Sequence, residues 1–324
     1  MNLNNSVCVV GGGYWGKNHI RTLHDLNMLG AIVEYDKPTL DSYSKDYSNI
    51  QLYHSVDEAL KNDSLKGFTL ATPASTHFEI SKKILLSKRH LLVEKPIALE
   101  IQHASELNLL ADKNNLTLMV GHVMLFHPAI IKIKEIIDAG KLGKLQYIYS
   151  NRLNLGKVRN NENVFWSLAP HDISIFQYLT NSFPTAIKAE GSSFLQEGIH
   201  DSTITLLKYP NGVEGHIFVS WLHPFKEHRL TIIGSEAMLT FEDSLDGKPL
   251  KFYSKKFEMS SGVPEKLDGP VEKIIYEDKM ALTEELKYFC DHLDEKRPEI
   301  ANGKHALEVT NILVKASNQL EGDI

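Results

Sequence analysis

The chain has 324 residues, which is more than one ordinary hydrophobic core accommodates and indicates two domains. Its net charge of −6 at pH 7 excludes a general nucleic-acid-binding protein, because that class carries a basic surface. A local basic pocket for a polyanionic substrate stays compatible with this charge. The two cysteines, Cys8 and Cys290, lie near opposite ends of the chain in apolar surroundings, so we expect no disulfide framework and a cytoplasmic location.

The start of the chain carries no recognisable targeting segment. Residues 1–10 contain no basic stretch before the apolar run, which predicts that there is no signal peptide. No apolar run approaches the ~20 residues that a membrane helix needs. We therefore expect no membrane association.

Short apolar runs alternate with amphipathic helical patterns in the first third of the chain. This alternation is typical of βαβ units and predicts an α/β domain over residues 1–121, with a doubly wound parallel sheet. The apolar runs are the expected buried strands Val7–Val10, Ala31–Tyr35, Gly67–Ala71, His90–Val93 and Thr117–Val120.

The pattern changes after Gly121. A helix is expected over Ala129–Ala139, another over Pro170–Leu179, and two more close the chain. Between them the chain is rich in strand patterns separated by turn signals, which predicts an α+β domain over residues 122–324 with an open, mainly antiparallel sheet. The expected strands are Gln146–Leu153, Ala186–Gly191, Ser202–Lys208, Glu214–Trp221, Arg229–Ile233 and Met238–Glu242.

A glycine-rich segment, Gly11-Gly12-Gly13-Tyr14-Trp15-Gly16, joins the first predicted strand to a predicted helix. Gly11 permits a tight turn, Gly13 lets the backbone approach a pyrophosphate, and Gly16 lets the helix and strand pack closely. Free N–H groups at the helix N-terminus would bind the pyrophosphate. Asp36 lies 20 residues beyond Gly16, where a carboxylate accepts hydrogen bonds from ribose hydroxyls and repels a 2′-phosphate. This pattern predicts NAD rather than NADP; the alternative is a glycine turn without a ligand.

Two further segments follow predicted strands, at the sheet edge where such folds bind ligands. Thr72 and Pro73 can line the nicotinamide or its ribose, whereas His77 is expected to have a structural role at a helix start. In Glu94-Lys95-Pro96, the Lys95 ammonium would stabilise the alkoxide that forms when a hydroxyl loses its proton and hydride. The alternative for Lys95 is an ordinary surface lysine.

The second domain contributes Pro170-His171-Asp172, which is predicted to open a helix. His171 titrates near neutral pH and suits a base that removes a hydroxyl proton. Asp172 is its neighbour on the helix, so it is expected to cap the helix or bind a substrate hydroxyl rather than orient His171. The preceding loop, residues 151–163, is dense in Arg, Lys and Asn, and either grips phosphates or is an ordinary solvated loop; its candidate substrate-binding residues are Arg152, Asn154 and Arg159.

Histidines at close spacing provide no recognisable metal site. His122 and His127, like His223 and His228, lack a third ligand in the sequence, so we expect no metal.

Taken together, these motifs resemble the Gfo/Idh/MocA oxidoreductases, and the resemblance covers essentially the whole chain. It implies a Rossmann domain that binds the dinucleotide. Its cofactor-binding residues then include, beside Gly11, Gly13, Gly16, Asp36, Thr72 and Pro73, the residues Tyr14, Trp15, His77, Glu94, Lys95 and His122. It also implies a second sheet through which a homodimer or homotetramer assembles, Lys95 as a catalytic residue and His171 as the acid/base. Its motifs are the glycine segment, Ala71-Thr72-Pro73 with His77, Glu94-Lys95-Pro96, Val120-Gly121-His122 and Pro170-His171-Asp172.

The family pattern Asp-x-Gly-x-His is Ser167-Leu168-Ala169-Pro170-His171 here, which removes the carboxylate and argues against a simple inositol or glucose substrate. The segment Asn151–Gly156, with Glu162-Asn163 and Trp166-Ser167, resembles a nucleotide-sugar branch. Members of that branch oxidise carbon 3 of UDP-N-acetylglucosamine, or of its uronate, for surface polysaccharide or lipid A sugars.

The resemblance therefore implies NAD-dependent oxidation of a UDP-N-acetyl sugar in which Lys95 and His171 act on one hydroxyl. Which of the two is the base stays open. The alternatives are a dehydrogenase for a free polyol, inositol or aldose, and a non-catalytic NAD-binding regulator. The presence of both Lys95 and His171 argues against the regulator, which needs neither.

Overall fold

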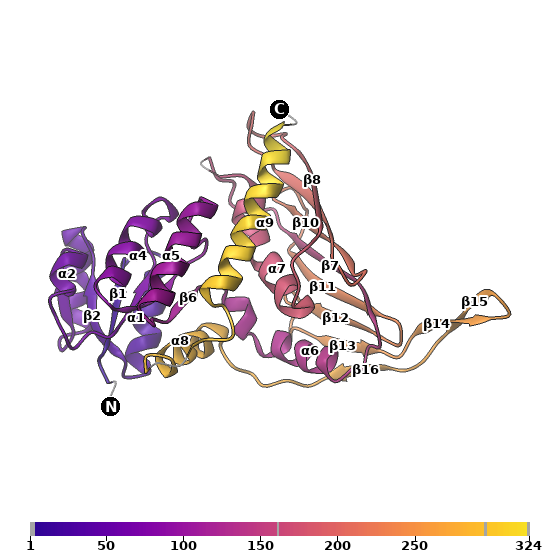
Figure 1. Ribbon diagram of the computed structural model, residues 1–324, viewed down its shortest axis with the longest axis horizontal. Helices are drawn as coiled ribbons and strands as arrows, with labels where there is room; N and C mark the ends of the chain where they lie inside the picture. Colours follow the sequence, from indigo (N-terminus) through magenta and orange to yellow (C-terminus); the bar gives the residue numbers. More distant parts are fainter. Residues whose placement is uncertain (1–3, 161, 295–296, 323–324) are drawn as a thin grey trace. The chain divides into compact units, whose positions relative to one another are not determined.

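The computed structural model describes residues 4–160, 162–294 and 297–322 (Figure 1). These residues form two compact units. The first unit comprises residues 1–126 and 279–310, and the second comprises residues 127–278 and 311–324.

The first unit is built on a six-stranded parallel sheet with strand order β3-β2-β1-β4-β5-β6. Its central strands are apolar and completely buried, which confirms the predicted doubly wound sheet. The prediction missed β3, a three-residue strand whose residues are exposed or partly exposed. The strands are β1 (Val7–Val10), β2 (Leu29–Val33), β3 (Gln51–Tyr53), β4 (Gly67–Leu70), β5 (His90–Val93) and β6 (Leu118–Val120).

Helices follow the strands of this sheet, and their apolar stripes are buried. Ile20 and Leu23 lie on the buried side of α1, and Leu107 and Ala111 on that of α5. These stripes follow the helical spacing expected for a face that packs on a core. The helices are α1 (Gly16–Asp25), α2 (Lys37–Asp46), α3 (Val56–Ala59), α4 (His77–Leu86) and α5 (Ile101–Lys113), with 3₁₀ turns η1 (Ala74–Thr76) and η2 (Val123–Phe126).

Part of the C-terminal region returns to the first unit. Helix α8 (Ala281–Asp291) buries Leu286 and Phe289, and Phe289 lies against the backbone of Gly67 in β4. The start of α9 (Gly303–Gly322) is joined to α5 by a hydrogen bond from Asn108 Nδ2 to Gly303 O of 2.8 Å. The predicted division into residues 1–121 and 122–324 placed this return in the second domain, because sequence order does not show which core receives an apolar helix face.

The second unit is built on an eight-stranded sheet with order β16-β13-β12-β11-β7-β10-β9-β8. Its neighbouring strands are antiparallel except β7 and β10, which confirms the predicted mainly antiparallel sheet. The strands are β7 (Leu145–Leu153), β8 (Ala186–Ser192), β9 (Ser202–Lys208), β10 (Glu214–Ser220), β11 (Glu227–Gly234), β12 (Met238–Glu242), β13 (Leu250–Tyr253) and β16 (Val271–Ile274).

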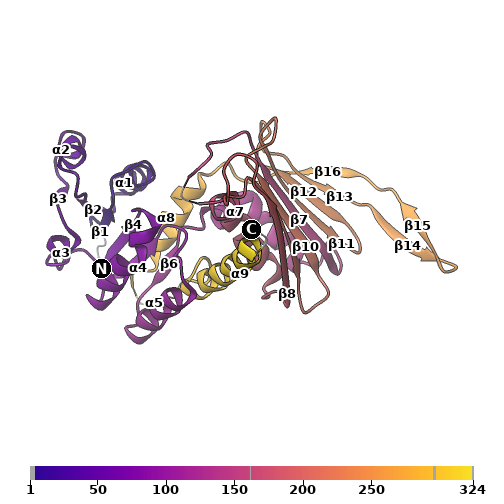
Figure 2. The same cartoon turned by 90° about the horizontal axis from the view of Figure 1, so that it is seen from above.

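Helix α7 (Val164–Thr180) packs on β7, β9 and β10, and α6 (Pro128–Asp138) packs on α7. Figure 2 shows α7 and the C-terminal part of α9 on one side of the sheet. A hairpin of β14 (Lys256–Ser260) and β15 (Val263–Leu267) extends away from the sheet (Figure 1).

Helix α7 begins earlier than predicted. The prediction placed Pro170 in the first turn, where proline is favoured. In the structure Asn163 caps the helix, since its side chain accepts a hydrogen bond of 3.1 Å from Trp166 N, and Pro170 lies inside the helix. His171 and Asp172 therefore lie in the middle of α7 and not at its start.

Candidate functional site

The glycine segment between β1 and α1 has the shape that its residues predict. Gly11 has a positive φ of 93°, and a Cβ on Gly16 would lie 1.8 Å from Gly11 O, so both positions require glycine. A Cβ on Gly13 would meet no atom within 4 Å. Tyr14 and Trp15, the next two residues, are both exposed. The segment thus leaves room for a ligand at Gly13, next to the N-terminus of α1.

Glu34 is the carboxylate that contacts this glycine segment. Gly12 N donates to Glu34 Oε2 at 2.7 Å, and Asp36 N donates to Glu34 Oε1 at 3.0 Å. From the other side, the Tyr43 hydroxyl donates to Gly12 O at 2.6 Å. Glu34 is 8% exposed and lines the pocket described below. This arrangement places a carboxylate at the point where a Rossmann fold receives the ribose.

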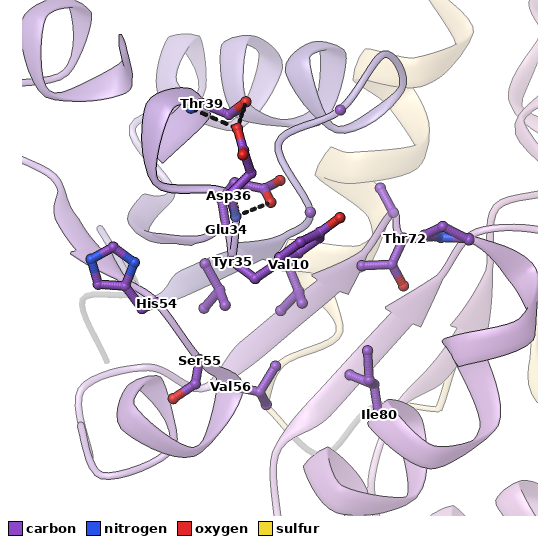
Figure 3. A pocket seen from close by; sticks show the side chains of 15 residues that line it. Val10, Glu34, Tyr35, Asp36, Thr39, His54, Ser55, Val56, Thr72 and Ile80 are labelled. Carbon is purple, nitrogen blue, oxygen red and sulfur yellow. Dashed lines mark hydrogen bonds between the residues drawn. The ribbon is translucent and has the colours of Figure 1, made fainter. Parts of the chain in front are cut away.

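Asp36, the residue predicted for that position, also lines this pocket, and its carboxylate caps helix α2. Its Oδ2 accepts hydrogen bonds from Thr39 N at 3.0 Å and from Thr39 Oγ1 at 2.6 Å, and these bonds lower the pKa of Asp36. Figure 3 shows its side chain turned toward Thr39. The prediction extended the second strand to Tyr35. Glu34 was therefore placed within the strand and was not considered as a ligand-binding residue. Because β2 ends at Val33, Glu34 is the first residue beyond it.

A pocket of about 450 Å³ lies at the carboxyl ends of β1, β2 and β4. Figure 3 shows Val56 and Ile80 along one of its walls, where they supply apolar surface suited to a flat base. Gly13 and Thr72 also line it, and Glu34 adds the carboxylate. An open glycine turn, an apolar wall and a carboxylate fit the pyrophosphate, base and ribose of a dinucleotide.

His77 connects the segment that follows β4 to the segment that follows β5. Its Nδ1 lies 2.7 Å from Pro96 O and its Nε2 lies 2.8 Å from Thr72 O, and the side chain is buried. Helix α4 begins at His77, as predicted. These contacts make His77 a structural link between Thr72 and the segment that carries Lys95.

A buried group of ionisable side chains lies next to Lys95. Glu94 Oε1 lies 3.0 Å from His19 Nε2, and Glu94 Oε2 accepts from Lys95 N at 3.3 Å. Glu285, on α8, is fully buried, and neither of its carboxylate oxygens has a hydrogen-bond partner among the described residues. Burial, and then the charge of Glu94, raises the pKa of Glu285 well above its usual value.

This shift predicts a pH dependence of stability. A raised pKa means that the folded chain holds a proton that the unfolded chain releases above a pH of about 4.3. The protonated carboxyl of Glu285 therefore contributes its full stability below that pH. This contribution is lost as the pH rises toward the pKa of Glu285 in the folded chain. Glu285→Gln imitates the protonated form, so we expect its Tm relative to wild type to increase from pH 4 to pH 8. Thermal melts across this range measure the difference.

The control for this prediction is Asp291→Asn, which removes an exposed carboxylate from the same helix. Its Tm difference from wild type should not grow with pH as that of Glu285→Gln does. A Glu285→Gln difference that stays constant or shrinks toward pH 8 would show that Glu285 is ionised in the folded protein.

His122 is also buried in the first unit. Neither ring nitrogen has a hydrogen-bond partner among the described residues, and the ring packs edge-on against His305 at a centroid distance of 5.4 Å. Burial, His305 and Lys95 lower the pKa of His122 well below its usual value, which favours the neutral imidazole. His122 is therefore a buried, neutral side chain that is close enough to Lys95 to interact with its charge.

In the second unit, Arg152 and Asp172 form a buried ion pair. Arg152 Nε donates to Asp172 Oδ2 at 2.7 Å and Nη2 to Oδ1 at 3.2 Å, while Nη1 lies 3.3 Å from His228 Nδ1. Arg152 is 7% exposed and Asp172 is 3% exposed. The fork that was predicted to bind a substrate phosphate is thus occupied by Asp172. The pair ties β7 to α7 at the residue next to His171.

The other predicted loop residues differ in exposure. Arg159 is exposed and pairs with Glu162 at 3.0 Å, and its carbonyl accepts from Gln196 Nε2 at 2.9 Å. Asn154 is partly exposed and donates through its backbone to Ser220 O. His171 is partly buried in the middle of α7. Residue 161 of this loop lies outside the described residues.

Across residues 4–160, 162–294 and 297–322, no group of three or more His, Cys, Asp or Glu side chains is arranged to hold a metal ion. Within the same ranges, every helix is too short or too polar to span a membrane.

Two family models match this chain. Residues 5–122 match the model described as an oxidoreductase family with an NAD-binding Rossmann fold. Residues 130–240 match the Gfo/Idh/MocA C-terminal domain. The chain belongs to the Gfo/Idh/MocA oxidoreductase family. It is therefore an oxidoreductase whose first domain binds NAD, and Lys95 and His171 each lie within a matched segment.

Curated relatives are distant. The chain is 24% identical over 296 residues to the UDP-N-acetylglucosamine 3-dehydrogenase of Acidithiobacillus ferrooxidans, a match that covers 91% of this chain and 90% of that protein. It is also 24% identical to an uncharacterised Bacillus subtilis oxidoreductase, YrbE, but this match spans only 63% of that protein's length. A match to the scyllo-inositol 2-dehydrogenase (NAD(+)) of Bacillus subtilis, at 24% identity, covers 56% of each chain.

Solved structures share the fold along nearly the whole chain. The Acidithiobacillus ferrooxidans 3-dehydrogenase superposes with a TM-score of 0.84 at 21% identity, covering 98% of this chain and 97% of that one. GenD2 from gentamicin A biosynthesis, solved in complex with NAD, superposes with a TM-score of 0.79 at 20% identity, covering 98% and 94%.

Proposed function

We propose that this protein oxidises a secondary hydroxyl, at carbon 3, of a UDP-N-acetyl sugar to a ketone. The observation that carries the proposal is the match to the Acidithiobacillus ferrooxidans 3-dehydrogenase, which spans nine-tenths of both chains. A product of this kind would enter surface polysaccharide or lipid A sugar synthesis.

Lys95 and His171 are the proposed catalytic residues. NAD, when bound, accepts the hydride from the carbon that is oxidised. The hydroxyl proton passes to His171 or to Lys95, and the ammonium of Lys95 orients the hydroxyl and stabilises the developing alkoxide. The neutral imidazole of His122 beside Lys95 adds no competing positive charge to this environment.

The proposed diphosphate ligand is Arg159 rather than Arg152. Arg159 is exposed, and its partner Glu162 can be exchanged for a phosphate, whereas Arg152 is held by a buried carboxylate. Asn154 stays a candidate contact for the sugar. We therefore reassign Arg152 and Asp172 from substrate binding to holding the middle of α7, where His171 lies.

The deciding experiment is a substrate panel. The purified protein is mixed with NAD and with UDP-N-acetylglucosamine, its uronate, free hexoses or inositol, and NADH formation is followed by absorbance. The proposal predicts turnover of a UDP-sugar and little turnover of the free sugars. Equal turnover of free hexoses or inositol would favour the alternative that the Bacillus subtilis inositol dehydrogenase represents.

Arg159→Ala should raise the KM for the UDP-sugar more than it lowers kcat, because it removes binding made equally to ground and transition states. Arg297→Ala is the control, since Arg297 is also exposed and ion-paired, with Asp112, but lies in the first unit. An unchanged KM in Arg159→Ala would remove Arg159 from the site.

We further propose that Glu34 binds the ribose and sets the preference for NAD. Glu34→Gln keeps an acceptor but loses the charge that repels a 2′-phosphate, so the ratio of NADP to NAD affinity should rise. Glu34→Ala should weaken NAD binding by about 10- to 100-fold, as expected for a charge-assisted hydrogen bond worth about 1.5–3 kcal/mol. Calorimetric titration with both dinucleotides measures these constants.

Asp36→Ala is the matched comparison for this prediction. It should change NAD affinity less than Glu34→Ala does, since two hydrogen bonds from Thr39 hold Asp36 Oδ2 at the start of α2. A larger loss of NAD affinity in Asp36→Ala would restore Asp36 as the ribose ligand.

We also propose that the chain forms a homodimer or homotetramer through the sheet of the second unit. Ile204 and Leu206, on β9, point away from the buried side and are 40% and 42% exposed. Light scattering of wild type and of Leu206→Glu tests this, because a charge on the contact face should dissociate the assembly. A wild-type monomer would contradict the proposal.

A further inference from the structure

The carboxylate of Glu94 lies at the meeting point of two chain segments beside the cofactor site. Its Oε1 contacts His19 Nε2 at 3.0 Å, and His19 lies in the first turn of α1, directly after the glycine segment. Its Oε2 accepts from Lys95 N at 3.3 Å. Both side chains are buried, His19 completely and Glu94 to 6% exposure. A single carboxylate therefore joins the glycine segment to the residue that carries the catalytic ammonium.

A third segment closes on the same carboxylate. A Cβ on Gly121 would lie 2.9 Å from the carboxyl carbon and from both oxygens of Glu94, so any side chain there would displace the group. Gly121 N donates to Val93 O at 2.8 Å, and His122 follows it. The ends of β5 and β6 and the start of α1 are thus packed around Glu94.

The burial of Glu94 argues against a contact with the cofactor through its side chain. Unlike Glu34, Glu94 is not among the residues that line the pocket of about 450 Å³. Both of its oxygens contact protein groups, as a buried carboxylate requires. A buried carboxylate with both oxygens in contact is rigid, and it therefore fixes the positions of the side chains and backbone that contact it.

We propose that Glu94 is a positioning residue whose carboxylate holds Lys95 in place relative to the glycine segment, with His19 as its partner. This inference rests on the proposed role of Lys95, and it replaces the predicted role of Glu94 in cofactor binding. Displacing a reacting group by about 1 Å costs on the order of 10²-fold in rate. The expected signature is a loss of kcat without a matching loss of ligand affinity.

The experiment compares Glu94→Gln, His19→Asn, the double variant and Gly121→Ala with the wild-type enzyme. Each single variant disturbs the same carboxylate from a different side, so the proposal survives a failure of any one of them to fold. The readouts are kcat and KM for the UDP-sugar, Kd for NAD, and amide hydrogen exchange of peptides covering residues 90–98. Glu285→Gln is the comparison, because it changes a neighbouring buried carboxyl that interacts with the charge of Glu94 but whose oxygens make no hydrogen bond to the described residues, His19 and Lys95 included.

We expect Glu94→Gln to lower kcat about 10- to 100-fold, with Kd for NAD and KM changed less than about threefold. The glutamine amide has only one acceptor oxygen for the contacts with His19 and Lys95 N, and it lacks the charge that strengthens them, so amide exchange should quicken in the peptide with Lys95. The double variant should be little worse than Glu94→Gln, since the two side chains act as one unit. Glu285→Gln should leave amide exchange of the peptide with Lys95 at the wild-type rate, because it removes no hydrogen bond from Glu94 or from Lys95 N.

Two results would overturn the inference. One is wild-type kcat and exchange in Glu94→Gln, and the other is a loss of NAD affinity larger than the loss of kcat, which would restore cofactor binding. If the wild-type protein turns over no sugar, the proposed function fails, but the exchange and NAD measurements still decide the role of Glu94.

Discussion

Replacing either Lys95 or His171 with alanine is expected to lower the single-turnover rate of NAD reduction by at least about 10²- to 10⁴-fold. Lys95 supplies the charge that stabilises the alkoxide, and His171 supplies a base whose usual pKa lies near neutrality. Kd for NAD should stay near its wild-type value, because the glycine segment and Glu34 are unchanged. Rapid mixing of the NAD-bound protein with the UDP-sugar measures the rate, and calorimetry measures the affinity.

The double variant tests whether both residues serve one chemical step. If they act on the same hydroxyl, Lys95→Ala with His171→Ala should be little slower than either single variant, because groups that work as a unit are strongly non-additive. Near wild-type reduction of NAD by His171→Ala would remove His171 from the mechanism and leave Lys95 as the candidate base.

Asp172→Asn is expected to destabilise the second unit by about 3–5 kcal/mol, the range for breaking a buried ion pair. The change leaves the guanidinium of Arg152 buried without its carboxylate. Urea unfolding followed by tryptophan fluorescence suits this test, since Trp166 and Trp221 both lie in the second unit. NAD affinity, a property of the first unit, should not change.

Two comparisons separate this pair from an ordinary surface pair. Removing both charges, with Arg152→Met and Asp172→Leu, should recover much of the stability, because no unpaired charge remains. Glu190→Gln breaks the exposed contact with Lys188 and should leave the urea midpoint unchanged within error. If Asp172→Asn unfolds at the wild-type midpoint, Arg152 is free to serve as the substrate ligand that the sequence first suggested.

Most of the architecture follows from local patterns. Alternating apolar runs and helical stripes predicted the parallel sheet, and the strand patterns after residue 121 predicted the mainly antiparallel one. The turn made by Gly11 and Gly16 could also be predicted, because its requirement is a property of the backbone at those positions. These features depend on residues close together in the sequence.

The partner of each buried ionisable group was decided by the tertiary structure alone. Asp36 has the expected spacing from the glycine segment, yet Glu34 contacts Gly12, because β2 ends two residues earlier than its apolar pattern suggested. The sequence predicted that Arg152 binds a phosphate, but Arg152 on β7 pairs instead with Asp172 on α7.

Helix α7 and helix α8 differ from the predictions for a related reason. Pro170 suggested a helix start in the sequence, but the side chain of Asn163 caps the helix seven residues earlier, so Pro170 lies inside it. The apolar face of α8 is visible in the sequence, but the core that receives it, beside Gly67, is not. By itself, the sequence determined the two sheets, the glycine turn and the identity of the candidate catalytic residues, since these depend on residue type and short spacing. Which charges are paired and which stay available to a ligand depends on contacts between distant segments, and only the tertiary structure decided that.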